Sequence, residues 1–301
     1  MLRPWLELAR ISNLPTVWTN VTAGWLLAGG PWLDARLGWL LLAGSLLYTG
    51  GMILNDAADV KFDSEHRKER PIPSGRVSVA AAWSVGIGML VVGWCVAVFV
   101  GQACWGITSA LVAAILFYDL YHKSWSGAVW VMGACRVLLV LMAASSCPSL
   151  ESCLTSFSIL PSALALGAYI VGLTIVARME AKGAVTSAWR AVFAKTLIFA
   201  PAIVATICAI TRSNWKLISI LSDLSPLAPF ALILIFVGMV VHATRVMRQG
   251  GPAIGNAVGI LLAGIAVVDA LAVSQVSLPL AFGFVVLAPL LRLWQRWIAA
   301  T

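Results

Sequence analysis

Five of the twelve acidic residues lie within fourteen positions of one another, in the segment NDAADVKFDSEHRKERPIPSGRVS that begins at Asn55. Asp56, Asp59 and Asp63 are separated by three and four residues, so a helix would place them on one face. Carboxylates this close repel each other unless a cation lies among them. Mg²⁺ prefers hard oxygen ligands and commonly binds one or two carboxylates together with the phosphates of a substrate. We therefore predict that Asp56, Asp59 and Asp63 bind Mg²⁺.

Basic residues follow the acidic ones in the same segment. Arg67 and Arg70 continue the helical spacing, and guanidinium groups bind phosphate oxygens in a bidentate manner. Asn55 adds a neutral amide beside them. The alternative is a solvated charged loop after a membrane helix, but the order of acids, bases and the turn sequence RPIPSG favours a metal–diphosphate site. We predict that Asn55, Arg67 and Arg70 bind a diphosphate.

The composition places this segment in a membrane protein. The chain has 301 residues, of which 61% are hydrophobic and 11% charged, and its mean hydropathy is +0.95. Soluble domains carry about 25% charged residues, so this class is excluded. We expect one all-α domain, residues 1–301, built as a polytopic bundle of nine to ten transmembrane helices. The predicted spans are 15–30, 37–54, 79–100, 104–121, 127–145, 159–176, 191–210, 226–246, 254–273 and 278–297.

If the N-terminus is placed inside, most of the 20 Lys and Arg residues lie on the inner side of the predicted spans. The acidic segment lies on that side too. The positive-inside rule then predicts a cytoplasmic N-terminus and C-terminus, with two inward segments at 55–78 and 177–190. The net charge of +8 is accompanied by no nucleic-acid-binding motif, so we expect the lipid bilayer, not nucleic acid, as the partner. Cys147 and Cys153 share an outward loop, where a disulfide and two free thiols both remain open.

The pattern NDxxDxxxD after the second span, followed by RPIPSG, resembles the first aspartate-rich motif of the UbiA superfamily of intramembrane prenyltransferases. Within it, MGACRVLLVLMAAS and YIVGLTIVARMEAKGA are most similar to the divergent branch encoded in ebo gene clusters. The resemblance implies a UbiA-like helical bundle with a central cavity open to lipid. It also implies two acidic sites that hold a prenyl diphosphate through Mg²⁺, with Asp56 and Asp59 as catalytic residues of the first site. An acceptor in the cavity would receive the isoprenyl group.

Two further motifs carry over by position. The superfamily's tyrosine–lysine motif has a near match in YDLYHK, where Lys123 would hold diphosphate and Tyr118 would steady the cation or its leaving group, both as catalytic residues. An interfacial aromatic belt with a snorkelling lysine is the alternative. The second acidic motif is reduced to ARMEAKG, in which Glu180 is the sole carboxylate. Glu180 is predicted to be a catalytic ligand of a second Mg²⁺, and Arg178 to bind diphosphate.

Arg136 and Asp269 are charged residues that lie deep inside predicted spans. Arg136 is roughly 13 Å into the fifth span, where an unpaired arginine is costly and functional by default. It would bind substrate diphosphate in a cavity, or pair with Asp119 or Glu180. Asp269 lies deeper in the ninth span, too far for a direct pair with Arg136, and its role stays open.

These features predict a Mg²⁺-dependent prenyltransferase that transfers an isoprenyl group from a prenyl diphosphate to an unidentified small-molecule or lipid acceptor, hydrophobic or aromatic in character. We expect it in the plasma membrane of a bacterium. The reduced second motif keeps an alternative open: a non-catalytic or weakly catalytic protein that binds or transports an isoprenoid or lipid.

Overall fold

The computed structural model describes residues 2–123, 125–147, 158–181, 188–212 and 227–295. Its described residues form helices and no strands. In chain order the helices are α1 (Leu2–Leu8), η1 (Ile11–Asn13), α2 (Leu14–Leu27), α3 (Ala35–Ala58), α4 (Val60–His66), α5 (Val79–Cys95), the π-helical turn η2 (Val96–Val100), α6 (Trp105–Tyr121), α7 (Ala128–Ala144), α9 (Ile159–Ala181), α10 (Ala188–Arg212), α12 (Ala228–Met247), α13 (Pro252–Ala263), α14 (Ile265–Val273) and α15 (Leu278–Trp294).

Each predicted span overlaps a helix, so the all-α prediction is confirmed. Six helical stretches are long and apolar enough to cross a membrane, and α6, α7 and α15 are shorter apolar helices. The ninth predicted span is divided at Gly264 into α13 and α14. The predicted inward segments prove partly helical, because α4 follows α3 directly and α9 extends to Ala181. Cys153 and Lys182 lie outside the described residues.

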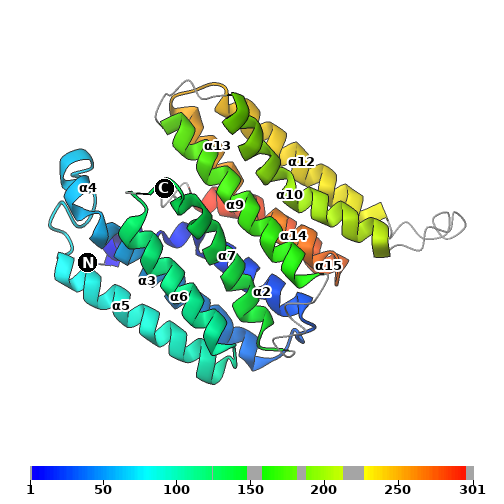
Figure 1. The fold of residues 1–301 in the computed structure, drawn as a ribbon, viewed down its shortest axis with the longest axis horizontal. Helices are drawn as coiled ribbons and strands as arrows, with labels where there is room; N and C mark the ends of the chain where they lie inside the picture. The colour runs from blue at the N-terminus through cyan, green and yellow to red at the C-terminus, as the bar shows by residue number, and fades with distance from the viewer. Residues whose placement is uncertain (1, 124, 148–157, 182–187, 213–226, 296–301) are drawn as a thin grey trace, which may run out of the picture.

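The helices are arranged so that α2, α7 and α14 lie between two outer groups (Figure 1). On one side α3 packs against α5 and α6, and on the other α9 packs against α10, which contacts α12. The inner helix α2 contacts α3, α7 and α14. Residues on α2 and α14 are accordingly buried almost throughout, including polar residues that have no access to water.

Glycines allow close contacts between helices, among them those that α7 makes with α2 and α9. A Cβ atom added at Gly24 would lie 2.3 Å from the carbonyl oxygen of Val140, so α2 and α7 are packed backbone to backbone at this point. Gly133 and Gly167 permit a similar approach of α7 to α9. Small residues allow this close packing in membrane bundles, where dispersion contacts are a main source of helix association. The position of α7 is therefore tightly defined by its neighbours.

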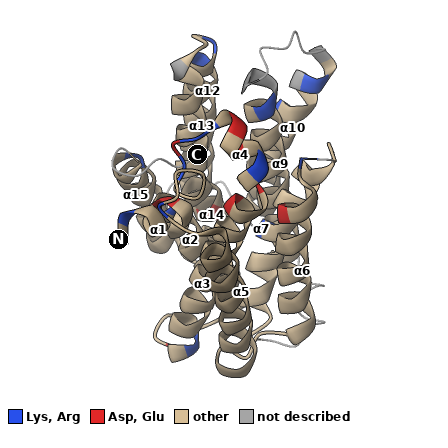
Figure 2. Cartoon of the chain, turned by 90° about the vertical axis from the view of Figure 1, so that its left-hand side faces the viewer, with Lys and Arg blue, Asp and Glu red and all other residues tan. Residues whose placement is uncertain are grey.

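Charged residues lie mostly toward the end of the bundle that carries α4, as Figure 2 shows. The opposite end of α3 carries Arg36, which forms an ion pair with the N-cap residue Asp34. This asymmetry agrees with the predicted grouping of the basic residues at one end of the spans.

Replacing Gly24 by alanine should lower the thermal unfolding temperature, because the new methyl group cannot fit beside the Val140 carbonyl unless α2 and α7 separate. Overpacking of this kind costs about 1–3 kcal/mol. The matched control is Gly38→Ala on α3, where a Cβ meets nothing within 4 Å and alanine is the better helix former. Thermal unfolding of the two detergent-purified variants measures the difference. Equal unfolding temperatures would contradict the close packing of α2 on α7.

Candidate active site

The acidic segment is an almost continuous helix, as its spacing predicts. The Asp59 amide donates to the carbonyl of Asn55, and the Asp63 amide donates to that of Asp59, each at 3.0 Å. Asp59 thereby joins the end of α3 to the start of α4. Asp56 and Asp63, seven residues apart, lie two turns from each other on the same face, and Asp63 is only 1% exposed. The predicted stripe of three carboxylates is present.

Arginines from two directions neutralise the first and third of these carboxylates. Arg70 Nη1 lies 3.2 Å from Asp56 Oδ1 and 2.7 Å from Asp63 Oδ2. Arg10 Nη2 reaches Asp56 Oδ1 from the chain before α2, at 3.4 Å. The RPIPSG turn therefore brings Arg70 back over the helix that precedes it. Arg67, the other predicted arginine, ends α4 and its side chain is exposed.

The second carboxylate faces the YDLYHK motif. Lys123 Nζ lies 2.7 Å from Asp59 Oδ1, and His122 Nε2 lies 3.4 Å from Asp59 Oδ2. Burial acts to raise the pKa of Asp59, but hydrogen bonds and charge from His122 and Lys123 outweigh it and hold the pKa below its ordinary value. Asp59 is therefore ionised at neutral pH. Lys123 also lies over the Phe62 ring, 4.0 Å from its centroid, which docks the end of α6 against α4.

Two more contacts tie α6 to its neighbours. Asn55 Nδ2 donates to Asp119 Oδ1 at 3.1 Å, while Asp119 Oδ2 is buried and has no hydrogen-bond partner. Arg178 of α9 lies close enough to Tyr118 to interact electrostatically with its hydroxyl group. Residues that the sequence placed in three separate motifs thus meet at one end of the bundle. The side chain of Glu180 lies outside the described part of the chain, so its predicted role is untested.

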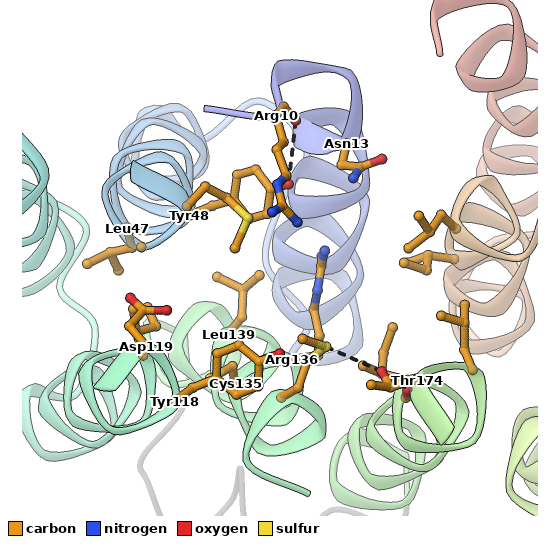
Figure 3. A pocket seen from close by; sticks show the side chains of 18 of the residues that line it. Arg10, Asn13, Leu47, Tyr48, Tyr118, Asp119, Cys135, Arg136, Leu139 and Thr174 are labelled. Carbon is orange, nitrogen blue, oxygen red and sulfur yellow. Dashed lines mark hydrogen bonds between the residues drawn. The ribbon is translucent and has the colours of Figure 1, made fainter. Parts of the chain in front are cut away.

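A cavity of about 280 Å³ opens beside this cluster. Its polar lining includes Tyr118 and Asp119 from α6, Arg136 from α7, and Arg10, while Leu, Ile, Met and Val side chains form most of the rest. Figure 3 shows that Arg10 and Arg136 reach the same cavity from different parts of the chain. Such a cavity, apolar with a few polar groups at defined positions, is typical of ligand sites.

Arg136 lines the cavity but does not use the predicted carboxylate partner Asp119. Its Nη1 donates to Asn20 Oδ1 at 2.6 Å and its Nη2 donates to Thr16 Oγ1 at 3.2 Å. Its guanidinium also lies 5.8 Å from the centroid of the Tyr48 ring. Arg136 and Asp269 form no direct ion pair, as expected, but Asn20 contacts both, since its Nδ2 donates to Asp269 Oδ2 at 2.7 Å.

Arg10 is a site residue that the sequence patterns missed. It pairs with Asp56, 46 positions away, and no spacing rule connects the two. Its backbone is left-handed, with φ +43°, a conformation that costs energy for a residue other than glycine. The Arg10 carbonyl accepts hydrogen bonds from Tyr48 Oη and from the Asn13 amide, which hold this turn. A strained basic residue beside an acidic cluster indicates a functional position.

The magnesium prediction was tested against the donor set. Within the described ranges no three His, Cys, Asp or Glu side chains converge as metal ligands, and arginine and lysine side chains contact carboxylate oxygens of Asp56, Asp59 and Asp63. However, Asp63 Oδ1 is buried and has no partner. Hard carboxylate oxygens with one unsatisfied atom fit Mg²⁺, provided that Arg10 and Arg70 release part of their contact.

A family model described as the UbiA prenyltransferase family matches residues 16–258. The chain belongs to this family. The match runs from the first predicted span to the start of the ninth and covers both inward segments, so the UbiA resemblance noted from NDxxDxxxD is confirmed. It does not separate the ebo-cluster branch from the rest of the family.

Curated relatives are matched over shorter stretches. A digeranylgeranylglyceryl phosphate synthase of Methanopyrus kandleri is 36% identical over 124 residues, which is 41% of this chain and 44% of that protein. The corresponding protein of Sulfolobus acidocaldarius is 32% identical over 41% of this chain and 44% of its own length. The chain thus spans less than half the length of these relatives.

Solved structures share the fold over most of the chain. A structure of a digeranylgeranylglyceryl phosphate synthase has a TM-score of 0.65 at 16% identity, covering 91% of this chain and 98% of its own. A UbiA homolog from Archaeoglobus fulgidus, bound to GPP and Mg²⁺, has a TM-score of 0.59 at 14% identity, covering 94% and 99%. The UbiA-like fold predicted from the sequence is confirmed.

Arg67 and Arg70 provide a direct test of the ion-pair cluster, since both were predicted to hold phosphate but only Arg70 contacts buried carboxylates. Arg70→Gln should lower the free energy of unfolding on the order of 3 kcal/mol, because it leaves Asp63 charged, buried and unpaired. Arg67→Gln, at an exposed position, should change it by less than about 0.5 kcal/mol. Thermal unfolding in detergent compares the two. Equal losses would mean that the pairing of Arg70 with Asp63 is not what stabilises this end.

Proposed function

We propose that the protein is a Mg²⁺-dependent intramembrane prenyltransferase that transfers an isoprenyl group from a prenyl diphosphate to a hydrophobic or aromatic acceptor. The observation that carries the proposal is the acidic cluster of α3 and α4, which adjoins an apolar cavity inside a membrane bundle. Family membership supports it, as does a structural neighbour that is bound to GPP and Mg²⁺.

The residues divide into those that hold metal and those that hold diphosphate. Asp56, Asp59 and Asp63 would bind Mg²⁺, with Glu180 as the ligand of a second ion. The ion supplies charge neutralisation for a diphosphate leaving group. Arg70, Lys123 and Arg178 already lie at the cluster, and with Asn55, Arg67 and Arg136 they would bind phosphate oxygens. Arg10 adds a further guanidinium that the structure brings to the same place.

Diphosphate binding also keeps the positive and negative charges of this cluster paired. Arg10, Arg70 and Lys123 are paired with carboxylates in the structure. A diphosphate that enters brings negative charge of its own, so these side chains can exchange carboxylate oxygens for phosphate oxygens without being left unpaired. The carboxylate oxygens that they release are then available to a cation.

In the reaction, the bond between the first prenyl carbon and its diphosphate oxygen breaks, and the diphosphate leaves with the electron pair. The acceptor forms a new bond to that carbon and loses a proton. Lys123 and the arginines would stabilise the leaving group, and the Tyr118 ring would face the developing allylic cation. The apolar lining excludes water, which otherwise captures such a cation.

We further propose that the chain is an integral protein of a bacterial plasma membrane with both termini cytoplasmic, and that it belongs to the ebo-cluster branch. The charge asymmetry of the bundle supports the orientation. The relatives named above are archaeal, so the bacterial assignment rests on the sequence motifs alone.

Turnover by purified protein tests the function. Radiolabelled geranyl, farnesyl and geranylgeranyl diphosphates would be supplied with Mg²⁺ or EDTA, together with a prenylglyceryl phosphate, an aromatic acid and a lipid extract as acceptors. We expect product only with Mg²⁺. Asp59→Ala should reduce turnover about 100-fold, since it removes charge stabilisation of the leaving group, and Glu180→Ala tests the second site in parallel.

The matched control for this assay is Glu65→Gln, which removes an exposed carboxylate from the same segment and should leave turnover unchanged. Binding of prenyl diphosphate that requires Asp59 but yields no product with any acceptor would favour the carrier alternative. Absence of both binding and product would refute the diphosphate site itself.

A further inference from the structure

A second polar cluster lies in the middle of the bundle, away from the ion-paired carboxylates of α3 and α4. It consists of Asn20 on α2, Arg136 on α7 and Asp269 on α14, with Thr16 beside them. Asn20 is fully buried and Asp269 is 2% exposed. Buried charge is expensive in a membrane protein unless it is paired or serves a function. None of the steps proposed above uses Asp269 or Asn20.

The geometry orients the Asn20 amide in one direction only. Its oxygen accepts from Arg136 Nη1 at 2.6 Å, and its nitrogen donates to Asp269 Oδ2 at 2.7 Å. In the reversed orientation the amide nitrogen would face a guanidinium, which has only donors, and the oxygen would face a carboxylate, which has only acceptors. Asp269 therefore holds Asn20, and Asn20 in turn holds the Arg136 guanidinium.

The Arg136 guanidinium, held in this way, presents its positive charge to the cavity. Its direct hydrogen-bond partners, Asn20 and Thr16, are both neutral. Arg10, the other arginine in the cavity lining, is already paired with Asp56. Because Arg136 also lines the cavity, an anionic group that enters meets a fixed guanidinium whose charge is not cancelled at contact distance.

We propose that Asp269, acting through Asn20, is a positioning residue for Arg136, whose guanidinium binds a phosphate group of a prenyl ligand in the cavity. This inference rests on the proposed function and deepens it. The phosphate belongs either to the prenyl diphosphate or to an acceptor of the prenylglyceryl phosphate kind. In both cases helix α14, from the C-terminal part of the chain, determines how a residue of α7 meets the ligand.

A double-mutant cycle on the full chain in detergent tests this coupling. Binding of radiolabelled geranylgeranyl diphosphate with Mg²⁺ forms one arm, and binding of a radiolabelled geranylgeranylglyceryl phosphate forms the other. In at least one arm, Arg136→Gln and Asp269→Leu should each weaken binding about tenfold, the loss expected for a hydrogen bond to a charged group. In the Arg136→Gln background, Asp269→Leu should change affinity less than about twofold, because its effect acts through Arg136.

Three further variants separate positioning from stability. Asp269→Asn keeps an oxygen that accepts from Asn20 and should bind within about threefold of the wild type. Asn20→Leu replaces Asp269→Leu in the cycle if the latter does not fold. Tyr169→Phe removes another buried hydrogen bond, from Tyr169 Oη to the Leu261 carbonyl, outside the cavity lining, and should lower the unfolding temperature without changing affinity.

The outcomes separate this inference from the proposed function. Suppose that the wild type binds, and that Asp269→Leu changes affinity by the same factor in the wild-type and Arg136→Gln backgrounds in both arms. This result overturns the positioning role while the proposed function stands. If Arg136→Gln leaves the affinity unchanged in both arms, the positioning role is overturned as well. A wild-type protein that binds neither ligand refutes the proposed function and this inference together.

Discussion

Carboxylates buried in an apolar bundle require cations beside them, and this requirement organises the charged end of the protein. Asp56 and Asp63 are both buried, and each is held by Arg70, which follows them in the chain. Asp59 is held by Lys123 at the end of α6. The turn after α4 and the end of α6 are therefore both fastened to the α3–α4 helix, and the mouth of the cavity is formed by elements that these ion pairs bring together.

The same requirement operates in the middle of the bundle, but with a different solution. Arg136 and Asp269 are not in direct contact, and a neutral amide, Asn20, connects them. At the charged end, Arg10, Arg70 and Lys123 are engaged in direct pairs with carboxylates. In the middle, the intervening amide orients Arg136 without neutralising it at contact distance. Both arrangements combine arginine with aspartate. They differ in whether a carboxylate lies in direct contact with the guanidinium.

Much of this organisation follows from sequence patterns that are local. Hydropathy located the helices because a membrane span needs a long continuous apolar stretch. The spacing of Asp56, Asp59 and Asp63 predicted their common face because helical periodicity relates only near neighbours. The ends of the helices were less well predicted. Helix α9 continues past its apolar part, because a helix end is determined by backbone hydrogen bonds and not by hydropathy.

What could not be predicted depends on contacts between distant parts of the chain. Asn20 and Thr16 are short polar residues in an apolar span, where they give no more signal than Ser or Thr elsewhere in the bundle. Asn20 contacts a residue 249 positions away. In the sequence Arg10 is only one basic residue near the N-terminus, and its pairing with Asp56 depends on a left-handed turn that no sequence pattern indicates.

The apolar lining of the cavity gives these charges their strength. Electrostatic interactions weaken in water and strengthen where the dielectric constant is low. Leu, Ile, Met and Val side chains from α3, α6, α7, α9 and α13 surround the cavity, so a charge that develops there has few groups other than Arg10, Asp119 and Arg136 to interact with. For the transfer that we propose, the fold has two tasks at once: to keep water from an allylic cation, and to hold a highly charged leaving group. The ion-paired end of the bundle would hold the leaving group, and the apolar lining of the cavity would keep water away. The two tasks are therefore carried out at different positions along the helices.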